Sequence, residues 1–282
     1  MKNKDFLKIL KHDIKFGTES IFCLYFIAIL FILSVILEFQ NIITEEGISK
    51  DMVTCADYLV YMFRGMSEYI PDVNKNFEIS KIWIVLQIIP AIIIAAFPKK
   101  DLYESGMQII VKSKSRKKWW NSKCIWVIIH VFIFYLLIHL IIIIVQFANG
   151  GKISFYVNGK LNMDINGFDF VNVNKFNILL MLVVVPVINA VTVSLFQMLL
   201  TFVTSPAIAV ISVIGIHVLT AYYNTPLLTG NYVMILRNRY VTGYGISNIC
   251  AVLINIVLVF IIIIIGNLYF QNCDFLRKNN EE

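Results

Sequence analysis

Histidine and cysteine are the side chains that a metal site or a nucleophilic centre would need, and this chain has four and five of them. His130 and His139 are nine residues apart in one apolar run, so at about 100° per residue they fall on opposite helix faces. His217 lies in another apolar run without a carboxylate beside it. The cysteines form no C-x-x-C pair and no zinc-ligand spacing. The sequence therefore predicts no metal centre, and we interpret the three histidines as packing or cavity residues.

The sequence also lacks the residues that two classes of enzyme require. The sequence contains no G-x-x-x-x-G-K-[ST] loop to hold phosphates, and Gly243 and Gly245 have neither the lysine nor the spacing. An intramembrane peptide-processing enzyme needs a nucleophile with a base, or paired acids, at membrane depth. The adjacent Glu45 and Glu46 lie in a polar segment with no histidine near them. We predict a chain that is not an enzyme and binds no cofactor itself, with the peptide-processing enzyme kept as an alternative.

Long apolar runs must position any functional residue. Of the 282 residues 59% are apolar and 15% are charged, against roughly 25% charged in soluble domains. This composition predicts a single domain over residues 1–282, an all-α polytopic membrane protein with six transmembrane helices. The predicted spans are 21–37, 82–97, 124–147, 176–203, 206–222 and 249–269.

All 24 basic and all 18 acidic residues lie outside these spans. Proton-coupled carriers and ion pumps usually hold ionisable groups at membrane depth, where such groups are costly and functional. The driving energy for any transport is therefore expected to enter through another protein.

The stretch 98–123, between the second and third spans, orients the chain because it carries eight Lys or Arg against two acids. The positive-inside bias places it in the cytoplasm. Alternation then makes both termini cytoplasmic and puts 38–81, 148–175 and 223–248 outside, so that fifteen of the 24 basic residues lie inside. The expected location is the bacterial cytoplasmic membrane. Topology and contact with membrane lipid account for the net charge of +6 without nucleic acid.

Periodicity predicts several smaller elements. Residues 1–17 have an apolar stripe opposite lysines and are expected to form an interfacial helix along the inner leaflet. Residues 51–70 have helical spacing that Pro71 ends. Residues 153–165 alternate on both sides of Asn158-Gly159, which predicts a β-hairpin. The helix and hairpin are expected to form a small extracellular cap from 38–81 and 148–175, or else ordinary ordered loops.

The basic stretch contains a short motif in which a few residue types follow one another in a defined order. Glu104 and Gly106 precede apolar residues 109–111, followed by Ser115-Arg116, the tandem Trp119-Trp120 and Lys123 at the start of a long span. The two tryptophans beside lysines are typical of interfacial anchors. This order resembles the cytoplasmic loop of type-2 ABC transporter permeases, which reads roughly E-x-G-T, several apolar residues, P-x-S-R and a Lys. This sequence departs from it with Met107 for Thr and with Ser113 or Lys114 where Pro is usual.

The resemblance implies a pair of six-span permease subunits, a homodimer or a heterodimer, on two cytoplasmic ABC ATPase subunits that bind ATP and Mg. It also implies that 98–123 contains a coupling helix seated in the ATPase and braced by the N-terminal helix 1–17. The coupling residues that it implies are Asp101, Leu102, Glu104, Gly106, Met107, Ile110 and Arg116.

Polar residues in two spans are candidates for a translocation path. Asn189 and Gln197 are about 80° apart on a helix and can share one broad face, and His217 is the third candidate. The same face suits a subunit interface equally. Because the spans hold no fixed charge, the expected cargo is hydrophobic or amphipathic: a membrane-active peptide such as a bacteriocin or a phenol-soluble-modulin-like toxin, with a lipid-linked glycan or drug as the alternative. A peptide immunity or sensor membrane protein remains the other function open.

Overall fold

The computed structural model describes residues 2–71, 76–95, 97–151, 153–170 and 173–272. Within these ranges the chain is helical and contains no strand. Five helical segments are long and apolar enough to cross a membrane: Phe6–Glu45, Lys81–Ser113, Arg116–Ala148, Lys175–Val203 and Asn248–Asn272. The helix α10 (Pro206–Tyr222) is apolar but has 17 residues. The predicted all-helical membrane protein is confirmed at this level.

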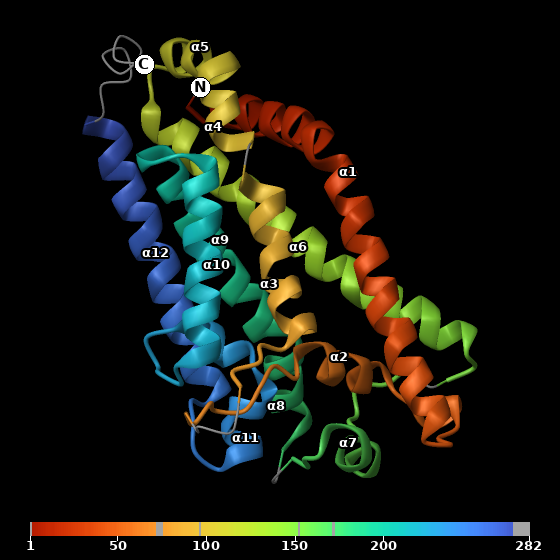
Figure 1. Cartoon of the computed structure of the whole chain (residues 1–282). Coiled ribbons are helices and arrows are strands. Elements are labelled where there is room, and N and C mark those ends of the chain that lie inside the picture. Colours follow the sequence, from red (N-terminus) through yellow and green to blue (C-terminus); the bar gives the residue numbers. More distant parts are fainter. Residues whose placement is uncertain (1, 72–75, 96, 152, 171–172, 273–282) are drawn as a thin grey trace.

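The long helices run between two ends of the molecule (Figure 1). One end holds α4 (Phe97–Asp101), α5 (Met107–Ser113) and the start of α6 (Arg116–Ala148), and we call it the α5 end. The other holds α2 (Cys55–Phe63) and α7 (Gly159–Asn166), and we call it the α7 end. The helix α6 has 33 residues, about 50 Å, and it runs obliquely between the two ends (Figure 1).

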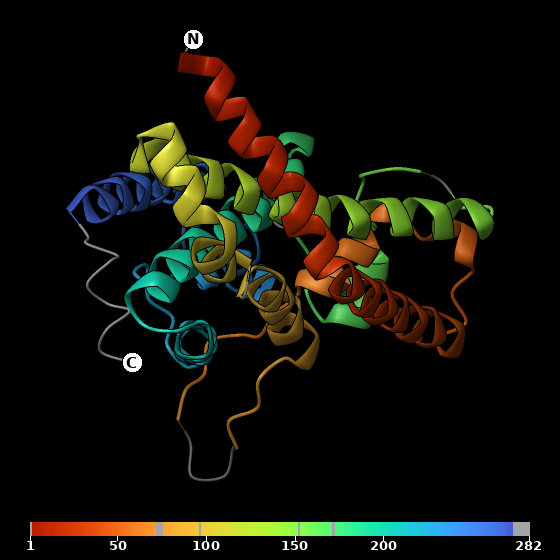
Figure 2. The ribbon, with the colours of Figure 1, turned by 90° about the horizontal axis from the view of Figure 1, so that it is seen from above.

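The helix α1 (Lys2–Glu45) is continuous and contains residues 2–17 of the expected interfacial segment 1–17 and the expected first span 21–37. The helix changes direction along its length (Figure 1) and its first part crosses α6 (Figure 2). Gly17 permits close contact there, because a Cβ at this position would lie 2.3 Å from the Trp126 indole nitrogen. Leu7 and Ile14, from the predicted apolar stripe, are exposed. The stripe therefore remains available to a membrane surface.

The remaining helices form the body of the bundle. The helix α3 (Lys81–Ala95) contains Pro90 and leads towards α4. One continuous helical segment consists of α8 (Lys175–Leu179), the π-helix η3 (Leu180–Val184) and α9 (Val185–Val203). This segment packs against α12 (Asn248–Asn272), α10 and α6. The Ser205 side chain caps α10 by accepting a hydrogen bond from the Ile208 amide, and Pro206 occupies the first turn of the helix. A tight turn therefore sends α10 back along α9.

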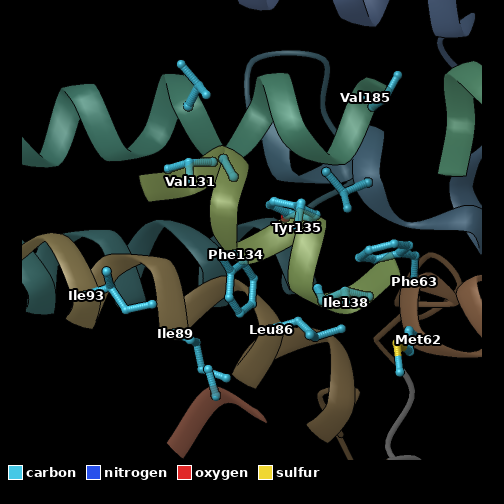
Figure 3. Close-up of a cluster of buried hydrophobic side chains, with 14 of the residues drawn as sticks. Met62, Phe63, Leu86, Ile89, Ile93, Val131, Phe134, Tyr135, Ile138 and Val185 are labelled. Atoms are coloured by element: carbon cyan, nitrogen blue, oxygen red, sulfur yellow. The ribbon is translucent and has the colours of Figure 1, made fainter. Parts of the chain in front are cut away.

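The core lies where α3, α6, α9 and α2 meet. Phe134, Tyr135 and Ile138 of α6 point towards Leu86 and Ile89 of α3 and towards Met62, Phe63 and Val185 (Figure 3). Each of these side chains is buried. Contact among helices far apart in sequence therefore joins the α7 end to the long helices.

The predicted β-hairpin at 153–165 is wrong. Asn158 caps the helix α7 by accepting a hydrogen bond from the Leu161 amide. The Asp57 carboxylate also accepts hydrogen bonds from the Asn158 amide (2.9 Å) and from Asn162 Nδ2 (3.1 Å). Because Asn and Gly occur at helix caps as well as at hairpin turns, a contact with a distant segment decides between them.

The predicted helix at 51–70 is shorter than expected. Thr54 and Asp57 form a capping box that starts α2 at Cys55, and the helix ends at Phe63, well before Pro71. Gly65 follows with a φ of +67° and lies against Met234, so a glycine turn and not the proline ends it. The hydrogen bonds of Asp57 with Asn158 and Asn162 join the segments 38–81 and 148–175.

The segment after α10 folds into the short helices η4 (Thr229–Val233), η5 (Ile235–Arg237) and α11 (Arg239–Thr242). Arg237 is 5% exposed and donates to the carbonyl oxygens of Thr220 and Ala221 at the end of α10. It also donates to the carbonyls of Met66 and Ser67. Arg237 therefore closes the end of α10 and ties it to 66–67.

Candidate functional site: a buried ion-pair cluster

Lys123 lies at the centre of a buried ion-pair cluster at the α5 end. Its Nζ is 2.5 Å from Asp13 Oδ1 and 2.6 Å from Asp101 Oδ2. The side chains of Lys123 and Asp13 are fully buried, and that of Asp101 is 2% exposed. The ammonium also lies 4.7 Å from the Phe97 ring centre and 5.1 Å from that of Trp119. We call Asp13, Asp101 and Lys123, with His12, Ser105, Trp119 and Ser122, the ion-pair cluster.

Neighbouring polar side chains form hydrogen bonds with the carboxylate oxygens of Asp13 and Asp101. Ser122 donates to Asp13 Oδ2 at 2.6 Å, and Ser105 donates to Asp101 Oδ1 at 2.7 Å. Trp119 Nε1 donates to Asp101 Oδ2 at 3.3 Å. His12 Nε2 lies 3.2 Å from Asp101 Oδ1 and 2.9 Å from Ser105 Oγ. Both carboxylates are thus hydrogen-bonded as well as paired, which burial of a charge requires.

The cluster joins three parts of the chain. Asp13 comes from the first part of α1, Asp101 from the end of α4, and Lys123 from the second turn of α6. Removing one partner of a buried pair leaves an uncompensated charge in a medium of low polarity. The cluster therefore holds the segment 97–113 in one position relative to α1 and α6.

Local sequence explains how the loop reaches this position. Leu102–Gly106 form the π-helix η2, a wide turn that is often found at functional sites. Gly106 is needed there, because a Cβ would lie 2.8 Å from the Asp101 carbonyl oxygen and 3.0 Å from Trp119 Nε1. The helix α5 then ends at Ser113, Lys114 follows with a φ of 50°, and the Ser115 side chain caps α6 by accepting a hydrogen bond from the Lys118 amide.

Ligand atoms of His12, Asp13 and Asp101 all lie within 4.8 Å of one another, a spacing compatible with a metal ion. The Lys123 ammonium, however, contacts both carboxylates at 2.6 Å or less. A cation therefore already sits between the two acids, and the donor set fits the lysine better than a metal.

The predicted coupling residues divide into two groups. Asp101, Leu102, Gly106 and Ile110 are buried within the chain. Glu104 is exposed and pairs with Lys100 at 3.8 Å, while Met107 is half-buried. Arg116 donates to the Gln271 carbonyl oxygen at 3.1 Å and so ties α6 to α12. The buried group positions the loop, and the exposed surface belongs largely to Tyr103, Glu104, Gln108, Val111 and Lys112.

Trp119 and Trp120 do not serve as interfacial anchors, because both are fully buried in the chain. Trp120 donates to the Ile263 carbonyl oxygen and stacks on Phe270 at 5.0 Å. Gly266 of α12 leaves the space that the Trp120 ring fills. The tandem tryptophans therefore pack α6 against Phe270 of α12.

The three candidates for a translocation path are buried between helices. Gln197 donates to the Ala91 carbonyl oxygen of α3 at 2.7 Å. Neither amide atom of Asn189 has a hydrogen-bond partner among the described residues, and the same holds for His217 Nδ1. His217 lies edge-on to Trp83 at 5.7 Å. The structure thus places polar atoms inside the bundle without showing a channel among the described residues.

The other two histidines have hydrogen-bond partners. His130 Nδ1 lies 2.7 Å from the Tyr25 hydroxyl and His139 Nδ1 lies 2.6 Å from the Tyr135 carbonyl oxygen. His130 therefore joins α6 to α1, while the contact of His139 stays within α6.

Sequence reasoning missed Asp13 and His12 and treated Lys123 only as the residue that opens a span. A signal was present, since Asp13 is an acid on the apolar side of a lysine-rich helix. Its partner is 110 residues away, so spacing alone does not identify the pair.

Comparison with known protein families assigns the chain to one family. A family model described as "Protein of unknown function (DUF2705)" matches residues 65–276. The chain belongs to this family. The DUF2705 match contains Asp101 and Lys123, whereas His12 and Asp13 precede it. No curated protein matches the chain.

Proposed function

We propose that this chain is the permease subunit of an ATP-driven ABC exporter in the bacterial cytoplasmic membrane. In this proposal α10 crosses the membrane together with the five longer helices, which gives six spans. The α5 end then faces the cytoplasm, where the basic segment 98–123 lies. Two copies of the chain work with two ATPase subunits, and the cargo is hydrophobic or amphipathic, most simply a membrane-active peptide.

The observation that carries the proposal is the ion-pair cluster. A loop that receives force from a cytoplasmic ATPase must be fixed to the membrane helices, or the force is lost in bending the loop. Lys123 fixes Asp101 of the loop to Asp13 of α1 by contacts of 2.6 Å or less. Movement of the loop is thereby passed to α1 and α6 together.

The outward surface of the loop supports the same proposal. Val111 is 74% exposed and Tyr103 is 55% exposed, so the loop offers apolar side chains to a partner beside the charged Glu104 and Lys112. These side chains are turned away from the buried contacts that hold the loop. A change in this surface can therefore remove a partner without unfolding the loop.

Affinity purification of the tagged chain in mild detergent from its native membrane tests the proposal. We expect a stoichiometric Walker-motif protein and ATPase activity in the eluate. The double variant Y103A/V111E should lose this protein while keeping the elution profile of the intact chain. The control I70E carries the same acidic change at an exposed position of the α7 end and should retain it. Purification of the wild-type chain alone, without ATPase activity, would contradict the exporter proposal and favour the immunity or sensor function.

A further inference from the structure

A groove at the α5 end lies where α5, α6 and α12 meet. Its volume is about 410 Å³. It is lined by Ile110, Val111, Lys114, Ser115, Arg116, Lys117 and Gln271. Three of these residues are cations and none is an acid. The groove therefore favours a ligand whose polar part is anionic.

The groove is built by the turn between α5 and α6. Lys114 has a left-handed backbone, a conformation that usually selects glycine or asparagine, and Lys114 and Lys117 both line the groove. The side chains of both lysines are exposed. Arg116 donates to the Gln271 carbonyl oxygen at 3.1 Å and closes the groove against α12.

An exposed apolar stripe begins at the groove and runs along α12. Gln271 lines the groove, and the residues at helical spacing before it are Leu268, Ile264, Ile261 and Val257. These four are between 44% and 56% exposed. From Val257 to Leu268 the stripe is about 17 Å long, close to half of the roughly 30 Å hydrocarbon core of a bilayer.

We propose that the groove binds the headgroup phosphate of an anionic phospholipid whose acyl chain lies along the α12 stripe. The cations match the phosphate, and the continuous apolar stripe matches a hydrocarbon chain that points into the membrane. A soluble anion would use only the first of these features. The proposal requires no ATPase, so it can fail or succeed independently of the exporter function.

Native mass spectrometry of the full chain in mild detergent tests this proposal, with an equimolar mixture of phosphatidylglycerol and phosphatidylcholine as probe. We expect the phosphatidylglycerol complex to be favoured by about tenfold. The variant K114N/K117Q removes two groove cations, and asparagine tolerates the left-handed backbone at 114. It should lose this preference. The control K11Q/K112Q removes two charges from the same end but none from the groove, and it should keep the preference.

Three results would overturn the proposal. Equal loss of preference in both double variants would indicate attraction by overall charge. Displacement of the lipid by glycerol 3-phosphate at the same concentration would indicate a site for a soluble phosphate. Unchanged lipid binding by K114N/K117Q, together with loss of a co-purifying protein, would assign the groove to a protein partner.

Discussion

At the scale of single residues, Lys123 is constrained by burial and by two ion pairs. Its ammonium is fully buried and depends on Asp13 and Asp101 for compensation. Burying an ion costs several kcal/mol, which a well-placed partner offsets. The stability of this end of the molecule therefore depends on the whole ion-pair cluster rather than on one contact.

The variant K123M should lose about 3–5 kcal/mol of stability, because it leaves two buried carboxylates without a cation. The midpoint of thermal unfolding in detergent, followed by size-exclusion chromatography, measures the loss. The triple variant D13N/D101N/K123M should recover part of it, since the uncompensated charges are gone. The control K117M changes an exposed lysine and should unfold near the wild-type midpoint. Equal midpoints for K123M and K117M would show that the pairing contributes little.

Gly266 offers a second test at the residue scale. A Cβ there would lie 2.1 Å from the Trp120 ring, which Phe270 and the Ile263 carbonyl hold in place. Alanine at 266 should therefore destabilise the chain by about 1–3 kcal/mol through overpacking. Gly215 of α10 has no neighbouring atom within 4 Å of such a Cβ, so G215A should be neutral or slightly stabilising. A thermal midpoint for G266A at or above that of G215A would contradict the packing argument.

At the scale of elements, short helices at the α7 end depend on one carboxylate. Asp57 accepts from the Thr54 amide and hydroxyl on one oxygen and from Asn158 and Asn162 on the other. Burial raises the pKa of the Asp57 carboxyl, and the four donors offset part of that rise. The start of α2 and the start of α7 are therefore linked through a single side chain.

The variant D57A should weaken α2 and α7 together by about 1–3 kcal/mol, because it leaves buried donors unpaired and removes a helix cap. Hydrogen exchange followed by mass spectrometry checks this. Exchange should rise in peptides from both helices while the peptides of α6 and α9 remain protected. Asp164 of α7 is exposed, and D164A should leave the pattern unchanged. A rise confined to α2 would show that the link between the helices is not formed.

At the scale of the whole molecule, the two ends should lie on opposite sides of the membrane. Cys55, the natural thiol in the segment expected outside, is 1% exposed and would not report this. In a cysteine-free chain we instead choose Met52, 62% exposed at the α7 end, and Gln108, exposed on α5. An impermeant maleimide added to intact cells should label M52C and spare Q108C. After the cells are lysed, both should react. Labelling of Q108C alone in intact cells would invert the orientation.

Sequence alone determined the class of fold and the long helices, because about twenty consecutive apolar residues have few stable alternatives to a membrane helix. It also identified the loop at 98–123 as special, from its charge and the order of Glu104, Gly106 and Lys123. Composition and periodicity can be read directly from the sequence, so predictions based on them do not require knowledge of tertiary contacts. The orientation, the partner ATPase and the cargo remain predictions.

Tertiary structure alone decided where local patterns were ambiguous. Asn158-Gly159 suits a hairpin or a helix cap, and contact with Asp57, more than a hundred residues away in sequence, selects the cap. Trp119 and Trp120 suit a membrane interface or a core, and the space beside Gly266 places Trp120 inside. The pairing of Asp13 with Lys123 joins residues 110 positions apart. A buried charge needs a partner close to it in three dimensions, and the spacing of residues along the chain does not show which distant residue supplies that partner.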